Sequence, residues 1–286
     1  MARAFDVHPI DATFGAVITG VKLASIDDAT LRMLHEAWLQ YALLVFPAQS
    51  LSRAEQIAFA KRFGPLELEL SVLSNIKPDG TLRIESSDDD AVKIMKGNMI
   101  WHADSTYMPV QAKGAVFSAE IVPSAGGETE WADMRAAYEA LDATTRSKVD
   151  ALSAYHSLHY SQSKLGHVKR EGSEYHGYGL HDGPAPLRPL VKAHPETGRK
   201  SLNIGRHAYG IPGMEFEESE RFLDKLAADA CRPPRVYAHR WTSGDTVIWD
   251  NRCLMHRAMP WNMAEPRRMV HSRIAGDPAS ESAPVA

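Results

Sequence analysis

Ser243-Gly244-Asp245-Thr246-Val247-Ile248-Trp249 is the stretch that decides the fold class, because a turn leads directly into a short run of strand formers. The same pattern recurs through the second half of the chain, where turns such as 125–127 and 197–199 separate similar runs: 115–122, 201–204, 235–239 and 269–274. Many short strands with few helices predict a mainly β sandwich or barrel braced by flanking helices.

The first third of the chain carries the predicted helices. After residues 25–28, apolar side chains recur at helical spacing: Leu31, Leu34, Trp38 and Leu39. Residues 42–46 then predict a buried strand that ends at Pro47. Ser52 and Glu55 have the spacing of a capping box, which predicts a second helix through about Arg62.

Length and composition bound the functional class. The chain has 286 residues, of which 44% are hydrophobic, and a formal net charge of -4. This composition is globular and gives no reason to expect nucleic acid or an anionic membrane as a partner. Two cysteines, Cys231 and Cys253, are too few for a disulfide framework. Since neither a signal peptide nor a spanning apolar run is apparent, we expect a cytoplasmic protein with one domain over 1–286 and a flexible tail over 277–286.

His102-Ala103-Asp104 places two potential metal ligands two positions apart, where extended backbone points both side chains the same way. His256 lies far downstream, beyond the predicted strand that contains Trp249. Two histidines and one carboxylate on one face of a metal leave its other positions open, as in the facial triad of non-haem iron(II) oxygenases. Catalytic zinc sites also use three protein ligands, so these residues alone leave a zinc hydrolase open.

Arg267 follows His256 on a predicted strand whose inward face also carries His271 and Arg273. Burying an arginine is costly unless it meets an anion. A dicarboxylic co-substrate would supply that anion, because a guanidinium binds a carboxylate through two parallel hydrogen bonds. Arg268 points outward in this register, so we expect a solvated surface charge there. Ordinary surface salt bridges are the alternative for Arg267 and Arg273.

Several motifs resemble the taurine/2,4-dichlorophenoxyacetate dioxygenase family, in the order typical of that family and over roughly residues 8–276. They are Trp101-His102-Ala103-Asp104-Ser105-Thr106, Gly126-Gly127-Glu128-Thr129, His194-Pro195-Glu196-Thr197-Gly198-Arg199-Lys200 and Trp249-Asp250-Asn251-Arg252-Cys253-Leu254-Met255-His256-Arg257-Ala258. Stretches 97–99, 160–167 and 204–207 resemble the aryloxyalkanoate dioxygenases that are selective for the S enantiomer of 2-aryloxypropionates. The resemblance implies a double-stranded β-helix (jelly roll) with flanking helices.

The resemblance also implies the cofactor site. Iron(II) would be held by three ligands: His102, Asp104 and His256. The co-substrates would be 2-oxoglutarate and O₂. Thr129 and Arg267 match the family residues that hold the distal carboxylate of 2-oxoglutarate, and Trp249 matches an aromatic residue that lines the co-substrate side.

The substrate side follows the family less closely. Many members carry a second arginine, four residues after the first, for the acid group of the substrate. Here that position is His271, and we favour Arg273 on the same face because it is charged at every working pH. The rest of the pocket would draw on Leu73, Asn98 and Met108. The implied reaction hydroxylates the carbon beside the ether oxygen of an aryloxyalkanoate and releases a phenol and a 2-oxo acid, with succinate and CO₂.

Three alternatives remain open at this point. The same iron and 2-oxoglutarate residues would serve a sulfonate such as taurine, or an alkyl sulfate. A zinc hydrolase would use the three ligands but would leave Thr129, Arg267 and Arg273 without a joint purpose. A metal-binding β-barrel without catalysis would not require inward arginines. Since relatives commonly self-associate, we expect a homo-oligomer that binds a small carboxylate substrate and neither nucleic acid nor membrane.

Overall fold

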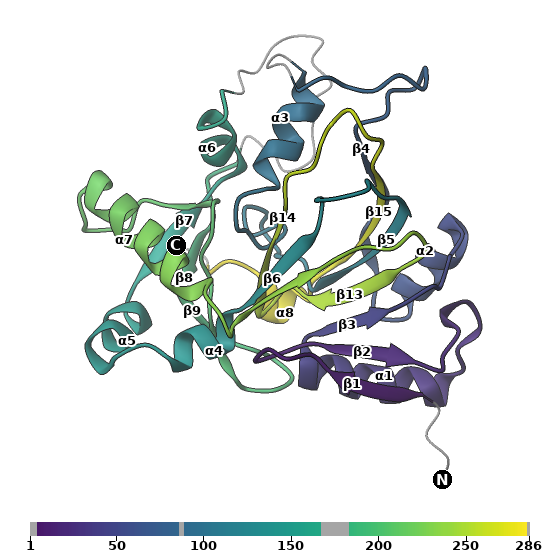
Figure 1. Ribbon diagram of the computed structural model, residues 1–286. Helices are drawn as coiled ribbons and strands as arrows, with labels where there is room; N and C mark the ends of the chain where they lie inside the picture. The colour runs from purple at the N-terminus through teal and green to yellow at the C-terminus, as the bar shows by residue number, and fades with distance from the viewer. Residues whose placement is uncertain (1–4, 86–88, 167–182, 285–286) are drawn as a thin grey trace.

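The computed structural model describes residues 5–85, 89–166 and 183–284, and strands dominate this part of the chain (Figure 1). The strands are β1 (Asp6–Pro9), β2 (Ala16–Thr19), β3 (Leu43–Phe46), β4 (Leu66–Ser74), β5 (Gly114–Ile121), β6 (Thr129–Asp133), β7 (Ser153–His156), β8 (Leu187–Pro189), β9 (Val191–Ala193), β10 (Lys200–Leu202), β11 (Ala208–Tyr209), β12 (Val236–His239), β13 (Thr246–Asp250), β14 (Leu254–Ala258) and β15 (Arg268–Ile274). The helices are α1 (Asp28–Tyr41), α2 (Arg53–Lys61), α3 (Asp90–Gly97), α4 (Met134–Glu139), α5 (Ala143–Asp150), α6 (Leu158–Ser163), α7 (Phe216–Ala230) and α8 (Pro278–Glu281), with a short 3-10 helix over Leu23–Ser25.

Strands from both ends of the chain meet in one sheet. The order of its seven strands is β1-β2-β3-β13-β5-β15-β4, and only the β2–β3 pairing is parallel among the described strands. A second sheet has the order β12-β6-β14, and two smaller sheets have the orders β11-β7-β8 and β10-β9. Strands β1 and β15, from opposite ends of the chain, therefore share one sheet.

The main sheet is buried on both faces, which explains why β3 is apolar at every position. Successive side chains of a strand point to opposite faces. Leu44 packs into one core with Trp38 of α1, whereas Leu43 packs into another with Trp131 of the second sheet. The two sheets therefore face each other, and helices cover the outside. This is the mainly β jelly roll with flanking helices that the sequence predicts.

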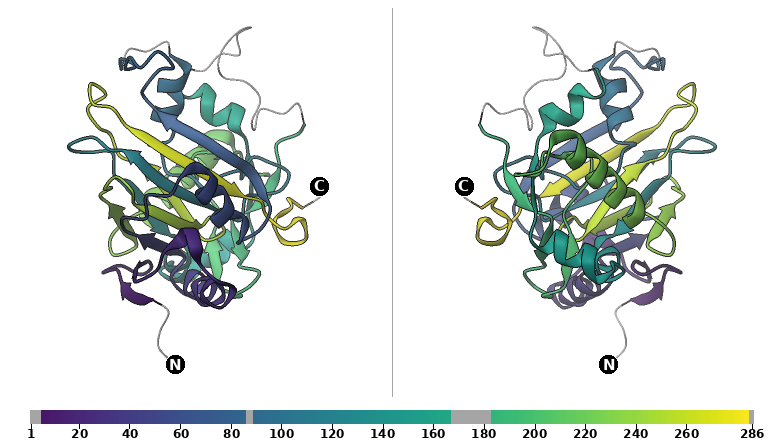
Figure 2. Two further views of the ribbon diagram at one scale, coloured as in Figure 1. Left: turned by 90° about the vertical axis from the view of Figure 1, so that its right-hand side faces the viewer. Right: turned by 90° about the vertical axis from the view of Figure 1, so that its left-hand side faces the viewer.

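The helices occupy different ends of the molecule. Figure 2 shows α1 at the end opposite α3 and α6. Helix α4 packs against β14 of the second sheet, and α7 packs against α4 and β11. Met134 of α4, Leu226 of α7 and Met255 of β14 lie in one core. The predicted capping box is present at α2: the Ser52 hydroxyl accepts from the Glu55 amide, and the Glu55 carboxylate accepts from the Ser52 amide.

The segment over 277–286, which the sequence predicts to be a flexible tail, makes several contacts with the rest of the chain in its described residues, which end at 284. The Asp277 carboxylate caps α8 by accepting from the Ala279 amide at 2.9 Å. Glu281 is only 2% exposed, and its carboxylate accepts a hydrogen bond from Lys192. A polar, Pro- and Ser-containing composition predicted disorder, but it did not reveal the ion pair of Glu281 with Lys192, which is remote in sequence.

No described helix is long and apolar enough to cross a membrane. Cys231 and Cys253 are both free thiols, and Cys253 is fully buried.

Candidate active site

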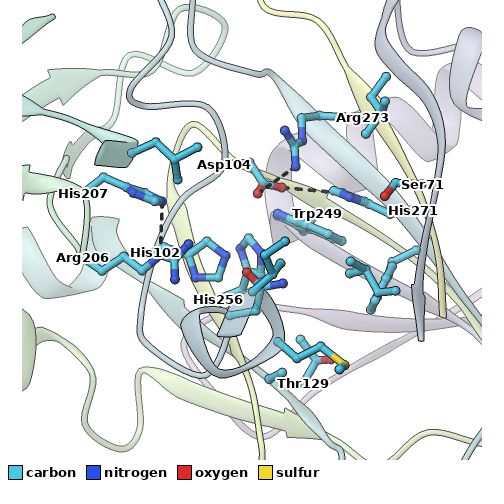
Figure 3. A pocket seen from close by; sticks show the side chains of 18 of the residues that line it. Ser71, His102, Asp104, Thr129, Arg206, His207, Trp249, His256, His271 and Arg273 are labelled. Carbon is cyan, nitrogen blue, oxygen red and sulfur yellow. Dashed lines mark hydrogen bonds and ion pairs between the residues drawn. The ribbon is translucent and has the colours of Figure 1, made fainter. Parts of the chain in front are cut away.

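Backbone pairing brings the two histidines of the predicted triad together. His102 and His256 form an antiparallel bridge, in which each amide donates to the other carbonyl, at 3.0 and 2.8 Å. Their imidazole centroids lie 4.3 Å apart. Asp104 follows two residues after His102, and one ligand atom from each of the three side chains lies within 4.8 Å of the others (Figure 3).

Neighbouring residues fix the orientation of these ligands. The Ile100 carbonyl lies 2.7 Å from Nδ1 of His102, so Nδ1 must be the donor and Nε2 carries the lone pair for a metal. Asn251 holds the Asp104 backbone from both sides: its Oδ1 accepts from the Asp104 amide at 2.7 Å, and its Nδ2 donates to the Asp104 carbonyl at 2.8 Å. Supporting hydrogen bonds of this kind are typical of metal sites.

The charge states of the triad suit a divalent metal. Burial lowers the pKa of His102 and of His256, so both imidazoles are neutral near pH 7. Burial opposes ionisation of Asp104, but the Arg273 guanidinium holds the pKa of its carboxyl well below its usual range. Within the described residues, Asp104 Oδ2 and His256 Nδ1 are buried without a hydrogen-bond partner. Two neutral imidazoles and one carboxylate fit iron(II) with open positions.

A cavity of about 330 Å³ opens onto the triad. Its walls include four of the predicted substrate residues: Leu73, Asn98, His271 and Arg273. Contrary to our expectation, Met108 is not among the lining residues, and its carbonyl accepts from the buried Arg188 at 2.6 Å. Tyr107 lines the cavity instead.

Arg267 reaches the same cavity from the residue just before β15. It is 4% exposed, its guanidinium lies 5.0 Å from the Trp261 ring centroid, and Nη2 donates to the Gly127 carbonyl at 3.1 Å. Burial lowers its pKa to about 10, which still leaves it charged near pH 7. Its Nε finds no hydrogen-bond partner among the described residues. Arg268 points outward and lies 3.9 Å from Glu120, as the predicted register requires.

Thr129 and Trp249 both line this cavity. Thr129 is 4% exposed, and its Oγ1 accepts from the indole N–H of Trp241 at 3.0 Å, which leaves the hydroxyl proton for another acceptor. Trp249 stacks on His271 with ring centroids 5.6 Å apart and lies 4.8 Å from the His256 ring. A buried guanidinium and a hydroxyl donor thus line the cavity that the triad lines, as a dicarboxylate requires.

The two candidates for the substrate acid both point toward Asp104 (Figure 3). Arg273 Nη2 lies 3.3 Å from Asp104 Oδ1, and Nη1 donates to Ser105 Oγ at 3.2 Å. His271 Nε2 lies 3.5 Å from Asp104 Oδ2, but burial lowers the pKa of His271 to about 3, so this contact is not an ion pair near pH 7. Arg273 therefore already compensates a buried carboxylate.

The sequence-derived list of site residues did not include Arg206, His207 and Gln162. All three line the cavity, and Arg206 lies across the triad from Arg273 in Figure 3. A Cβ on Gly97 would come within 2.1 Å of the Arg206 guanidinium, so this helical glycine leaves the space that the arginine fills. The available signal was the resemblance of stretches 204–207 and 160–167 to the aryloxyalkanoate subgroup. Stretch 160–167 ends at a residue outside the described part of the chain.

A second group of possible ligands consists of His194, Asp250 and Cys253, all buried. The Asp250 carboxylate is already bound by Arg252, whose Nε and Nη2 donate at 2.8 and 2.6 Å, and lies 2.9 Å from His194 Nε2. We assign this group to a buried ion-pair network and not to a metal.

Comparisons with known proteins agree with this geometry. Residues 6–273 match the family model described as taurine catabolism dioxygenase TauD, TfdA family. An (S)-phenoxypropionate/alpha-ketoglutarate-dioxygenase of Sphingobium herbicidovorans is 68% identical over 99% of each chain. An alpha-ketoglutarate-dependent 2,4-dichlorophenoxyacetate dioxygenase of Cupriavidus pinatubonensis is 34% identical over 94% of this chain and 97% of its own.

Solved structures of dioxygenases also match this fold. The crystal structure of AAD-2 in complex with Mn(II) and N-oxalylglycine matches with a TM-score of 0.88, at 35% identity and with 99% of each chain covered. A taurine dioxygenase from Burkholderia xenovorans matches with a TM-score of 0.76, at 26% identity over 96% of this chain and 92% of its own. Because the family model covers nearly the whole chain and the fold follows its members, this chain belongs to the TauD/TfdA family of dioxygenases.

Proposed function

We propose that this enzyme oxidises aryloxyalkanoates, in particular S-2-aryloxypropionates, with iron(II), 2-oxoglutarate and O₂. The observation that carries the proposal is one cavity lined by both the His102/Asp104/His256 triad and the buried cation Arg267. The 68% identity to an (S)-phenoxypropionate dioxygenase supports the substrate class.

Different residues of the cavity would bind the metal and the co-substrate. The triad would hold iron(II), and Arg267 and Thr129 would hold the distal carboxylate of 2-oxoglutarate. When bound, iron(II) and 2-oxoglutarate supply the oxidation of a C–H bond by O₂, with succinate and CO₂ as co-products. Insertion of one oxygen atom beside the ether oxygen gives a hemiketal, or a hemiacetal from an aryloxyacetate. Its carbon–oxygen bond to the aryl group then breaks, which releases a phenol and a 2-oxo acid.

We infer that Arg206 anchors the substrate carboxylate and that Arg273 serves Asp104. Arg273 lies 3.3 Å from the Asp104 carboxylate, so a substrate acid would have to share it. His271 is neutral near pH 7, because burial lowers its pKa to about 3. Arg206 lines the cavity on the opposite side of the triad, where a guanidinium can bind a carboxylate through two hydrogen bonds.

A substrate panel tests the reaction. Iron(II) and 2-oxoglutarate are added anaerobically, followed by S- or R-2-phenoxypropionate, phenoxyacetate, taurine or an alkyl sulfate, and then O₂. We expect phenol and succinate with the S enantiomer at a rate at least about tenfold above that with the R enantiomer, since a misplaced C–H bond can cost on the order of 100-fold. Succinate with taurine or the sulfate alone would favour the sulfonate or sulfate alternative. Hydrolysis without O₂ consumption would favour a zinc hydrolase.

Matched variants test the anchor. Arg206→Gln and Arg273→Gln are compared for substrate affinity between about pH 6 and 8. With Arg206 as the anchor, affinity is flat with pH in the wild type and is lost in Arg206→Gln, because arginine keeps its charge throughout. Loss of substrate affinity in Arg273→Gln alone would show that Arg273 is the anchor. Affinity that falls with rising pH would point to His271.

A further inference from the structure

Arg188 is a buried cation outside the cavity, and within the described part of the chain its hydrogen bonds go to backbone carbonyls and to no carboxylate. It lies on β8 and is 4% exposed. Its Nε donates to the Thr106 carbonyl at 2.6 Å, and Nη2 donates to the carbonyls of Met108 and Pro109 at 2.6 and 3.3 Å. The loop that Arg188 binds begins directly after the predicted metal ligand Asp104.

The hydrogen bonds of Arg188 bracket one residue of the cavity wall. Thr106 and Met108 flank Tyr107, whose side chain lines the cavity and packs edge-on against His207 with ring centroids 4.7 Å apart. The loop also contains Ser105 at φ 57, a left-handed conformation that is uncommon for any residue except glycine. A strained loop keeps such a shape only where its surroundings enforce it.

The same guanidinium ties the loop to the C-terminal helix. Nη1 of Arg188 donates to the Glu281 carbonyl at 3.1 Å, and that carbonyl also accepts from the Gln111 amide at 3.1 Å. The Ala283 amide donates to the Pro109 carbonyl at 3.0 Å, and Lys192 binds the Glu281 carboxylate. One arginine therefore joins β8, the loop after Asp104 and α8. Lysine could not replace it, because only a guanidinium offers five donors in a fixed plane.

We propose that Arg188 is a positioning residue, which fixes Tyr107 on the substrate side of the cavity and uses α8 as its second support. The inference rests on the proposed oxidation of a small acid next to the triad. It assigns the C-terminal segment a part in substrate placement, although none of the described residues of that segment lines the cavity.

The test is the amount of phenol formed per succinate in Arg188→Lys. A poorly placed substrate lets 2-oxoglutarate be consumed without product, whereas a loss of folded protein lowers both products equally. We expect the ratio to fall at least about threefold and the KM for the aryloxy acid to rise about tenfold, since small misplacements near reacting atoms are costly. Mn(II) affinity and the half-saturating 2-oxoglutarate concentration should change less than about twofold, because Arg188 contacts neither set of residues.

Arg235→Lys is the matched control. Among the described residues its guanidinium likewise donates to backbone carbonyls, those of Asp229 and Ala230 at 2.7 and 3.0 Å, and it does not line the cavity. A chain that ends at Gly276 is the second variant, because it removes the Glu281 carbonyl and leaves Arg188 in place. The phenol-to-succinate ratio of this shortened chain should fall, as it does in Arg188→Lys. The ratio of Arg235→Lys should stay at the wild-type value.

An unchanged phenol-to-succinate ratio in both Arg188→Lys and the shortened chain would overturn the proposal and leave Arg188 a purely structural residue. An unchanged phenol-to-succinate ratio in the shortened chain alone would show that α8 does not support Arg188. If the wild type oxidises another acid and no aryloxy acid, the proposed substrate is wrong. The ratio of that other product to succinate then tests Arg188 in the same way.

Discussion

At the residue scale, the three triad side chains carry the first prediction. His256→Ala should weaken Mn(II) binding by at least about 100-fold, because loss of one ligand of three typically costs several kcal/mol, and about 1.4 kcal/mol corresponds to tenfold. Calorimetric titration of the metal-free protein measures this affinity without turnover. The exposed histidine variant His8→Ala is the control and should bind as the wild type does. Full affinity in His256→Ala would remove it from the site.

Arg267 and Arg268 are adjacent arginines with opposite environments, which gives a second prediction. Arg267→Ala should raise the half-saturating 2-oxoglutarate concentration more than about thirtyfold, since loss of a buried charge-assisted pair costs about 2–5 kcal/mol. Arg268→Ala should change it less than about twofold, because its contact with Glu120 is at the surface. The reverse result would mean that the outward arginine, and not the buried one, serves the co-substrate.

At the scale of an element, the turn before β6 determines how Arg267 lies. Gly126 and Gly127 both have positive φ, at 76° and 71°. A Cβ on Gly126 would meet the Pro260 carbonyl at 2.5 Å, and one on Gly127 would meet Arg267 Nε at 3.0 Å. The paired glycines therefore serve backbone conformation and, at the second position, close approach of the guanidinium.

Gly127→Ala should raise the half-saturating 2-oxoglutarate concentration about fivefold or more, because the added methyl group displaces Arg267, and about 1 kcal/mol corresponds to fivefold. Gly198→Ala is a close control: Gly198 has φ 69 and no atom within 4 Å of its added Cβ. Both variants should lose about 1 kcal/mol of unfolding free energy from backbone strain. An equal effect of both on 2-oxoglutarate binding would show that strain, and not contact, is responsible.

The elements themselves were largely predictable from local sequence. Runs 115–122 and 269–274 predicted β5 and β15 to within about a residue, because turns bound them and both faces are buried. The parity of β15 separated Arg267 from Arg268 correctly. Arg206 could not be found this way: it lies in a loop, where no periodicity tells which side chains point into a cavity. Burial of Glu281 likewise depends on Lys192, which is remote in sequence.

At the scale of the whole molecule, buried neutral histidines make stability depend on pH. His156 is fully buried, neither ring nitrogen has a hydrogen-bond partner among the described residues, and burial lowers its pKa to about 3. The unfolded chain binds a proton near the ordinary pKa of 6.5, so stability falls as pH drops from about 6.5 toward 3.

In metal-free protein, His156→Gln should therefore lose about 1 kcal/mol less unfolding free energy than the wild type between pH 6 and pH 5. Urea denaturation at both pH values measures the difference. The other buried histidines are common to both proteins and cancel in the comparison. Identical pH slopes would mean that His156 is protonated in the folded state or leaves its buried position.

The backbone bridge between His102 and His256 has a consequence for the order of events on the ribosome. More than half of the chain separates the two residues, and the main sheet also needs β15 beside β5. Chains grow at about 5–20 residues per second, so the nascent protein contains His102 and Asp104 but not His256 while more than half of the chain is made. A metal bound by that fragment would lack the third ligand, and selection among competing cellular ions can begin only when nearly all of the polypeptide has emerged.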